Sequence, residues 1–307
     1  MTARLRAADL PPLRGVVREG VGLAPLTWLR VGGTADLVVN PADAGDLAGL
    51  RRALPAGTPL LPMGVASNLL VRDGRLPGVV VRLGGPLARI QAEGTTVIAG
   101  AGALDQTVAR AAAKAGIAGL EWLIGIPGTV GGAVRMNAGA FGGETAGRLL
   151  WAEVMDGDGG VHRLTPAEIG FSYRESGLGP GLVVLRAAFA GTASDPAPVL
   201  ARMDAIRAER EASQPVRVAT GGSTFKNPEG QKAWRLVDRA GCRGLRLGRA
   251  TVSEKHCNFL VNTGGATAAE VEGLGEDVRR RVKDATGVTL EWEIVRVGEP
   301  VASQVAA

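Results

Sequence analysis

The chain has 307 residues, of which 46% are hydrophobic and 21% charged, a composition typical of a folded protein with two or three packed units. Its net charge of +5 comes from scattered arginines, and one tyrosine and five phenylalanines offer little surface for stacking bases, so we expect no nucleic-acid partner. No apolar run reaches the roughly 18 residues that span a bilayer, and two separate cysteines with two histidines form no zinc-binding pattern. We therefore expect a cytoplasmic protein with reduced cysteines, no metal and no membrane partner.

The first half of the chain alternates strand-like runs with glycine and proline. Strands are predicted near residues 35, 59, 78 and 95. A helix is predicted at 104–115, where apolar residues recur at helical spacing and Gly116 is placed to end it.

Strands are predicted again at 149–156 and 181–190, with a short helix between them. That helix begins at Thr165, because Thr165 can cap it, Pro166 suits its first position and Glu168 can reach back to the cap. A charged helix follows near 195–213, and the proline after Gln214 ends it. We place a domain boundary in this region.

The last third of the chain again alternates predicted helices with predicted strands. It predicts a helix at 233–240, a strand at 258–262, a helix that starts at the capping box of Thr267 and Glu270, and a strand that ends at Val297. The buried stripe of the long helix is predicted from its spacing to be Val271, Leu274, Val278 and Val282.

Three loops are candidates for ligand binding. The run from Gly125 to Gly143 holds seven glycines and a single charge, which favours a backbone that approaches a ligand closely, although a set of tight turns has the same composition. The loop at 64–68 could offer N–H groups to a diphosphate or form a simple asparagine turn. The loop at 221–228 gathers a hydroxyl, an ammonium and an amide. P-loop and complete Rossmann patterns are absent, so phosphate binding would use another scaffold.

Four segments occur together in one order: GIPGTVGGAVRMNAGAFGGE (125–144), FSYRES (171–176), GGSTFKNP (221–228) and VSEKHCNFLVN (252–262). In motifs and spacing the chain resembles the UDP-N-acetylenolpyruvoylglucosamine reductases, from Thr27 to about Gly298, and GSTFKNP favours their shorter subtype. The resemblance implies an α+β fold. Two FAD-binding subdomains of the vanillyl-alcohol-oxidase type would occupy 1–85 and 86–205, an α+β substrate-binding domain 206–300, and a disordered tail 301–307.

The resemblance also implies a reaction. NADPH would reduce FAD, and flavin N5 would then deliver hydride to the enolpyruvyl carbon of a UDP-sugar, giving UDP-N-acetylmuramate for peptidoglycan synthesis. The negative charge that forms on the substrate needs hydrogen-bond donors or cations at its carboxylate and a proton donor above its other carbon. The small UDP-sugar is the expected partner, and we expect a monomer.

Three residues match the family's catalytic positions. Arg174 would hold the substrate carboxylate, Ser223 would protonate the enolate, and Glu293 would support that chemistry. Glu293 stands five residues before Gly298, as the family pattern requires, and Glu291 does not. The structural alternatives are a surface ion pair for Arg174 and a helix cap for Ser223. The resemblance further implies four substrate-binding residues: Tyr173, Lys226, Asn227 and Asn258.

The cofactor positions come from three segments. The resemblance implies FAD contacts at Arg30, Gly32, Gly33, Gly64, Val65, Ala66, Ser67, Asn68, Gly125, Pro127, Gly128, Gly131, Gly132, Asn137, Ala138 and Gly139. The chain departs from the family at Ala66, where glycine is common. A positive φ there would cost about 1 kcal/mol.

Two rival functions follow from the same residues. An FAD oxidase that uses oxygen would keep the flavin fold, but GGSTFKNP and the Glu293 motif favour the substrate-reducing branch. A basic binding module without flavin is the non-enzymatic alternative.

Overall fold

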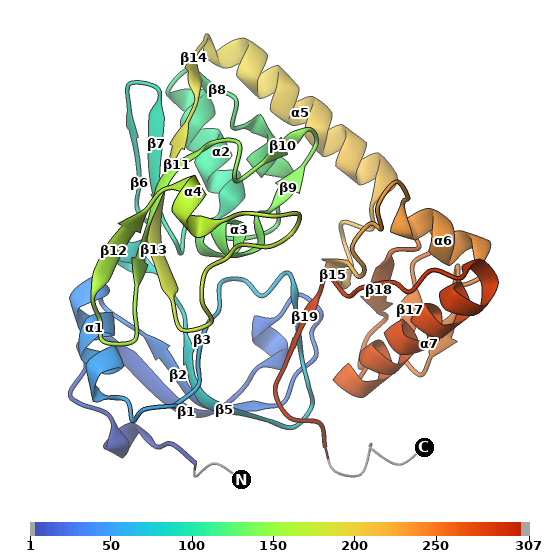
Figure 1. The fold of residues 1–307 in the computed structure, drawn as a ribbon, viewed down its shortest axis with the longest axis horizontal. Coiled ribbons are helices and arrows are strands. Elements are labelled where there is room, and N and C mark those ends of the chain that lie inside the picture. Colours follow the sequence, from blue (N-terminus) through green and yellow to red (C-terminus); the bar gives the residue numbers. More distant parts are fainter. Residues whose placement is uncertain (1–3, 302–307) are drawn as a thin grey trace.

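The computed structural model describes residues 4–301, and over them three sheets of four or five strands lie in different parts of the molecule (Figure 1). The expected tail at 301–307 lies, apart from Val301, outside the described residues. Within the described chain, no helix combines the length and the apolar character needed to cross a membrane.

The first sheet has the order β1-β2-β5-β3, with β1 antiparallel to β2 and the other pairs parallel. Its strands are β1 (Val16–Gly22), β2 (Thr34–Asn40), β3 (Leu60–Pro62) and β5 (Arg75–Val81). Helix α1 (Ala44–Ala53) packs on it, and the short helices η1 (Ala7–Asp9) and η2 (Ala24–Leu26) lie in this part of the chain. The strands predicted near 35, 59 and 78 are confirmed. The edge strand β1 was missed because most of its residues are exposed, so its sequence lacks an apolar alternation.

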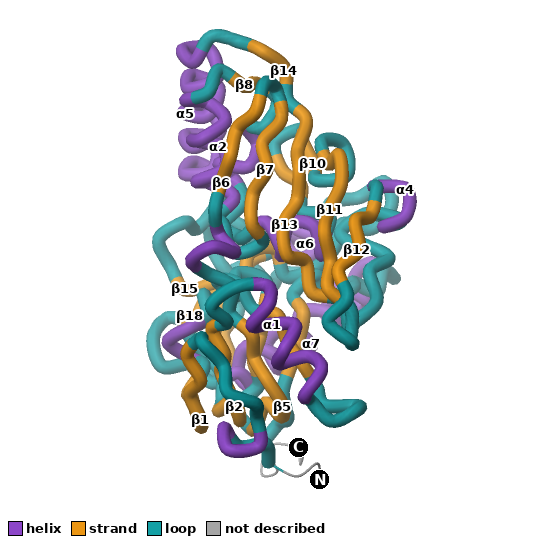
Figure 2. Tube along the Cα trace, turned by 90° about the vertical axis from the view of Figure 1, so that its left-hand side faces the viewer, coloured by secondary structure: helices purple, strands orange, loops and turns teal. Residues whose placement is uncertain are grey.

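The second sheet is antiparallel, with the order β12-β11-β13-β7-β6 (Figure 2). Its strands are β6 (Ile90–Glu93), β7 (Thr96–Gly100), β11 (Leu149–Met155), β12 (Val161–Leu164) and β13 (Val183–Ala190). The accompanying helices are η3 (Gly85–Ala88), α2 (Asp105–Lys114), η4 (Glu121–Gly125), α3 (Val130–Met136) and α4 (Pro166–Ile169). The predicted helix before Gly116 and the capping box that starts α4 are confirmed.

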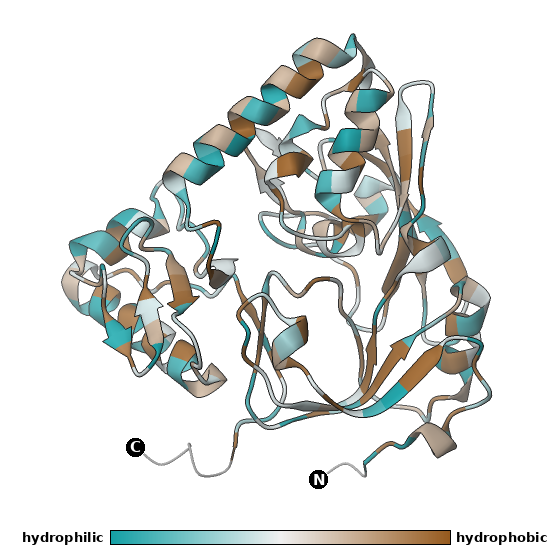
Figure 3. Ribbon diagram, turned by 180° about the vertical axis from the view of Figure 1, so that it is seen from behind, coloured by the Kyte–Doolittle hydropathy of each residue, from teal (hydrophilic) through white to brown (hydrophobic). Residues whose placement is uncertain are grey.

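Helix α5 (Pro196–Ser213) leads from the second sheet to the third (Figure 1). It alternates hydrophilic and hydrophobic positions (Figure 3), and its buried residues Val199, Met203 and Ile206 lie on one narrow stripe. The predicted charged helix is therefore confirmed. The expected division between residues 205 and 206 falls inside this continuous helix, and the three-part division itself stays a prediction.

The third sheet has the antiparallel order β15-β18-β17-β16. Its strands are β15 (Ala219–Ser223), β16 (Arg246–Leu247), β17 (Ala250–Val252) and β18 (Phe259–Asn262), and helices α6 (Ala233–Arg239) and α7 (Ala268–Thr286) pack against it. The four residues predicted as the stripe of α7 are fully buried, which confirms that stripe. Short two-residue pairs complete the fold: β8 (Ile117–Ala118) with β14 (Thr192–Ala193), and β9 (Gly139–Ala140) with β10 (Gly143–Glu144).

The end of the chain returns to its beginning. Strand β19 (Val295–Val297) runs parallel to β4 (Leu69–Val71), a pair that joins segments more than 200 residues apart. Both carboxylate oxygens of Asp73, just after β4, accept backbone N–H groups of Ala268 and Ala269 at the start of α7. These contacts bring the segment before β19, which holds Glu293, against the loop at 64–68.

Candidate active site

Two of the three expected catalytic side chains are in direct contact. Arg174 Nε donates to Glu293 Oε1 at 3.1 Å, and another guanidinium nitrogen donates to the carbonyl oxygen of Gly139 at 2.7 Å. The two side chains are 21% and 15% exposed. The structure therefore joins the loop after α4, which holds Arg174, to the segment before β19.

The loop that holds Arg174 is anchored on α3. Arg174 has a left-handed backbone, with φ of 58°. Asn137, which follows α3 as its C-cap, donates to the carbonyl oxygen of Ser172 at 2.9 Å, and the Ser176 hydroxyl donates to the carbonyl oxygen of Arg135 at 2.8 Å. A strained residue held on both sides in this way is characteristic of functional sites.

Glu293 is held by the backbone on either side of it. Its N–H donates to the carbonyl oxygen of Thr224 at 2.8 Å, and its carbonyl oxygen accepts from the Asn68 side chain at 3.0 Å. Ser223 directly precedes Thr224 at the end of β15. Within residues 4–301 the Ser223 hydroxyl has no hydrogen-bond partner, so it is neither a helix cap nor part of an internal network.

Burial shifts the protonation equilibrium of the Glu293 carboxyl toward its neutral form. Desolvation raises its pKa above the ordinary value, and the nearby cations Arg174 and Lys226 only partly oppose this shift. Glu291, the neighbour that could be confused with it, has a side chain that is 76% exposed and lies 3.9 Å from Lys226 Nζ. Residues 291–293 form no strand, and the two glutamates therefore occupy different environments.

A cavity of about 410 Å³ contains this pair. It is lined by four basic and two acidic side chains, together with Met136 and apolar residues of the β19 segment: Arg72, Met136, Arg174, Glu175, Lys226, Trp292, Glu293, Ile294, Val295 and Arg296. The excess of positive charge suits an anionic ligand. Sequence reasoning missed Arg72, Trp292 and Arg296. The last two lie inside the family segment around Glu293, whereas only the β4–β19 pairing brings Arg72 to the cavity.

The four expected substrate residues occupy different positions. Lys226 lines the cavity, and the Asn227 side chain donates to the Tyr173 hydroxyl at 3.2 Å. Asn258 is only 4% exposed, and its side chain bonds both the N–H and the carbonyl oxygen of Phe225. The structure thus gives Asn258 contacts that support the loop at 221–228.

The loop at 64–68 fits an anionic group such as the FAD diphosphate. Among the described residues, no acceptor takes the backbone N–H groups of Gly64 to Asn68 or those of Gly128 and Thr129. Successive free N–H groups form an anion-binding concavity. Ala66 has φ of 52°, so the strain anticipated at this position is present. A Cβ on Gly64 would lie 2.3 Å from Thr129 Oγ1, which shows that the two expected cofactor loops touch.

Several expected cofactor glycines are enclosed by the protein itself. A Cβ added at Gly33 would lie 1.8 Å from the carbonyl oxygen of Gly74. A Cβ at Gly125 would lie 2.4 Å from the Phe141 ring, and one at Gly131 would lie 3.0 Å from Ala101 Cβ. Tight packing therefore explains part of the glycine-rich run, which also contains the short helix α3. Gly132 has more room, with its nearest such contact at 3.8 Å.

A buried acid lies beside these loops and was missed by sequence reasoning. Asp105, at the start of α2, is 0% exposed, and neither carboxyl oxygen has a partner within the described residues. Its Oδ2 lies 2.8 Å from where a Cβ on Gly128 would be. Burial raises the pKa of Asp105 well above its ordinary value.

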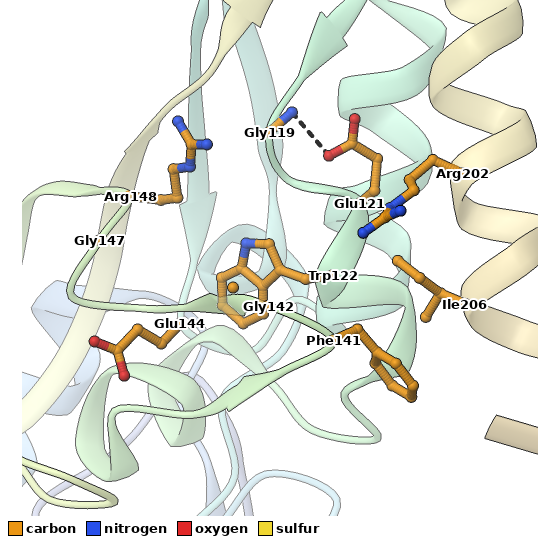
Figure 4. Close-up of a pocket in the computed structure, with 11 residues that line it drawn as sticks. Gly119, Glu121, Trp122, Phe141, Gly142, Glu144, Gly147, Arg148, Arg202 and Ile206 are labelled. Atoms are coloured by element: carbon orange, nitrogen blue, oxygen red, sulfur yellow. Dashed lines mark hydrogen bonds between the residues drawn. The ribbon is translucent and has the colours of Figure 1, made fainter. Parts of the chain in front are cut away.

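A second cavity, of about 400 Å³, lies between η4, the β9–β10 pair and α5 (Figure 4). Trp122, Arg148 and Arg202 are among its lining residues, and it contains none of the expected site residues. By contrast, three of the expected site residues, Arg174, Lys226 and Glu293, line the first cavity.

Comparisons with known proteins agree on one family. The family model described as "FAD binding domain" matches residues 35–165. The family model described as "UDP-N-acetylenolpyruvoylglucosamine reductase, C-terminal domain" matches residues 214–297. The chain is 55% identical to the UDP-N-acetylenolpyruvoylglucosamine reductase of Azorhizobium caulinodans over 96% of both chains, and 55% identical to that of Paramagnetospirillum magneticum over 94% of both.

A solved structure supports the same assignment. The UDP-N-acetylenolpyruvylglucosamine reductase of Thermus caldophilus superimposes with a TM-score of 0.81 at 39% identity, covering 94% of this chain and 100% of that one. The expected fold, with an FAD-binding part and a C-terminal substrate domain, is confirmed, as is FAD as the cofactor. The chain belongs to the UDP-N-acetylenolpyruvoylglucosamine reductase family of FAD-dependent oxidoreductases, which use NADPH as reductant in peptidoglycan precursor synthesis.

Proposed function

We propose that this chain reduces UDP-N-acetylglucosamine enolpyruvate to UDP-N-acetylmuramate, with NADPH as its reductant. The observation that carries this proposal is the contact between Arg174 and Glu293 in a cavity that also contains Lys226. Bound FAD would supply the redox chemistry, the relay of a hydride from NADPH to the enolpyruvyl carbon. The residues of the chain bind the substrate, stabilise the charge that develops on it and supply a proton.

Arg174 binds the substrate carboxylate in this mechanism. A planar guanidinium can donate two parallel hydrogen bonds to a carboxylate and so stabilises the negative charge that spreads onto it. The Gly139 carbonyl and Glu293 carboxyl hold the guanidinium in place. Its left-handed backbone fixes the direction in which the side chain leaves the loop.

Ser223 donates the proton that completes the reaction. Its hydroxyl is free of internal partners within the described chain, so it is available to the substrate carbon. Glu293 keeps its proton to a higher pH than an exposed glutamate, because burial raises its pKa. A neutral carboxyl can sit near the developing enolate without repelling it.

The cofactor segments and the remaining substrate residues have supporting roles. The free N–H groups of the loop at 64–68 and of Gly128 and Thr129 receive the FAD diphosphate. Lys226 and Asn227 contact the substrate, and Tyr173, which accepts a hydrogen bond from Asn227, contacts it beside them. Asn258 acts as a positioning residue that holds the backbone of Phe225.

A product assay tests the proposed reaction against the oxygen-using rival. Purified protein is mixed with NADPH and the enolpyruvyl sugar nucleotide without oxygen, and the nucleotide product is analysed by mass spectrometry. We expect NADPH oxidation beyond one equivalent per flavin only when the sugar nucleotide is present, and we expect the product to carry two added hydrogen atoms. NADPH oxidation that depends on oxygen and ignores the sugar nucleotide would support the oxidase instead.

A further inference from the structure

Arg296, on β19, is anchored through only part of its guanidinium. Its Nη1 donates to Glu272 Oε1 at 3.1 Å and to Glu276 Oε1 at 3.0 Å. The guanidinium carbon also lies 4.7 Å from the centre of the Trp292 ring, a cation–π contact. These contacts fix a long side chain that would otherwise lose conformational entropy on binding a ligand.

The other donors of Arg296 remain free. Within residues 4–301, neither Nε nor Nη2 of this side chain donates to an acceptor, and the side chain is 30% exposed. Arg296 lines the same cavity as Arg174, Lys226 and Glu293. Two free guanidinium donors on an anchored side chain that lines a cavity match the oxygens of a phosphate group.

Arg72, which lines the same cavity, differs in this respect. Its Nε and Nη2 donate to the two carboxylate oxygens of Glu272 at 2.9 and 2.8 Å, and its Nη1 donates to the carbonyl oxygen of Gly298 at 3.3 Å. All three guanidinium nitrogens of Arg72 are thus engaged by the protein. Arg72 holds Glu272 in place, and Glu272 in turn holds Arg296.

The cluster keeps a positive charge after these pairings. Arg72, Arg279 and Arg296 face Glu272 and Glu276, so the arginines outnumber the carboxylates. Lys226 adds another cation to the same cavity. An anion that enters here therefore meets unbalanced positive charge.

We propose that Arg296 binds a phosphate group of the nucleotide ligand that enters this cavity. The inference rests on the proposed function, in which Arg174 takes the substrate carboxylate and leaves the diphosphate of the same molecule to another cation. Both the sugar nucleotide and NADPH contain a diphosphate. The sugar nucleotide is the expected source, because Arg296 lies three residues from Glu293 on the same segment.

The test compares Arg296→Gln with Arg279→Gln. Arg279 also pairs with Glu276 and donates to the Leu290 carbonyl oxygen, but it does not line the cavity. We expect Arg296→Gln to raise the KM for the sugar nucleotide and the inhibition constant of inorganic diphosphate by about tenfold or more, with kcat changed less than about threefold. Arg279→Gln should leave all three constants near those of the wild type.

The two half-reactions identify the source of the phosphate. If Arg296→Gln needs a higher concentration of sugar nucleotide for half-maximal flavin reoxidation, the phosphate that Arg296 binds belongs to the sugar nucleotide, as expected. If the variant instead needs a higher concentration of NADPH for half-maximal flavin reduction, Arg296 binds a phosphate group of NADPH. Unchanged constants for the sugar nucleotide, NADPH and inorganic diphosphate would overturn the proposal.

Two further measurements keep the test decisive. Arg296→Lys retains the charge without the fork, so it should recover only part of the diphosphate affinity and serves if the glutamine variant does not fold. Calorimetric titration of the FAD-loaded wild type and variants with inorganic diphosphate needs no turnover. If the wild type fails to reduce the sugar nucleotide, the proposed function fails, and the same titration still decides whether Arg296 binds the anion.

Discussion

Backbone strain gathers at the residues expected to act. Among residues 4–301, the non-glycine residues with positive φ are Arg30, Ala66, Asn137, Phe141 and Arg174. Four of these five were expected in the active site from the sequence, and Phe141 belongs to the glycine-rich run. Each such residue costs of the order of 1 kcal/mol or more and persists only where surrounding contacts hold it.

Ser223 gives a prediction about one step of the reaction. Replacing it with alanine removes the proton donor and leaves the cofactor loops intact. We expect Ser223→Ala to keep flavin reduction by NADPH within about threefold of the wild type and to slow flavin reoxidation by the sugar nucleotide by more than about a hundredfold. Stopped-flow absorbance of the flavin measures both steps, and equal losses in the two would make Ser223 a scaffold residue.

Asp105 gives a prediction about stability. A buried carboxyl without partners costs about 1–3 kcal/mol, so Asp105→Leu, which removes the polar group, should raise the unfolding free energy of the FAD-free protein. The raised pKa also sets the sign of the pH dependence. The unfolded chain releases this proton near its ordinary value, so stability falls as pH rises above about 4 toward the folded-state pKa.

Urea denaturation over a pH series measures this effect. The matched control is Asp46→Asn, because Asp46 is also buried at the start of a helix but accepts backbone N–H groups of Arg14, Gly15 and Ala42. The control should lose stability. A loss of stability in the FAD-free Asp105→Leu variant as well would show that Asp105 makes a favourable interaction.

At the scale of elements, capping chemistry was readable from the sequence and long-range pairing was not. Thr165 with Glu168 and Thr267 with Glu270 form the predicted capping boxes, because the residues of a box are three positions apart. Strand β1 escaped prediction because its residues are mostly exposed, and α3 because glycine disfavours helices. The pairing of β4 with β19 has no local signal at all.

In the active site too, individual residues could be predicted from the sequence, whereas their long-range contacts could not. The resemblance assigned Arg174 and Glu293, and the structure brings them together across 119 positions. The partners that hold them, such as Asn68 and Thr224, could not be ranked from the sequence because a backbone carbonyl carries no residue-specific signal. Asn258 shows the opposite limit of sequence-based prediction. The family motif implied that its side chain binds substrate, but the structure shows that side chain bonded to the backbone of Phe225.

The start of α7 gives a prediction at this scale. Asp73→Ala removes both side-chain acceptors from the N–H groups of Ala268 and Ala269, so we expect a loss of about 1–2 kcal/mol in the free energy of unfolding. Thr267→Ala, which removes only the local cap, should cost about 1 kcal/mol. Chemical denaturation measures both, and an unchanged unfolding midpoint for Asp73→Ala would mean that the contact between β4 and α7 adds nothing to stability.

Across the whole molecule, the site is assembled from all three sheets. Arg174 comes from the second part of the chain, Ser223 and Glu293 from the third, and the loop at 64–68 from the first. Asn68 links two of these parts through its bond to the Glu293 carbonyl oxygen. A ligand bound at Arg174 therefore contacts elements whose relative positions depend on the entire fold.

One anaerobic titration tests the central claim most directly. Purified FAD-loaded protein is titrated first with NADPH and then with the enolpyruvyl sugar nucleotide while the flavin absorbance is recorded. We predict that NADPH bleaches the yellow colour and that the sugar nucleotide restores it in the absence of oxygen. A protein that binds no flavin, or a reduced flavin that oxygen reoxidises and the sugar nucleotide does not, would contradict the account.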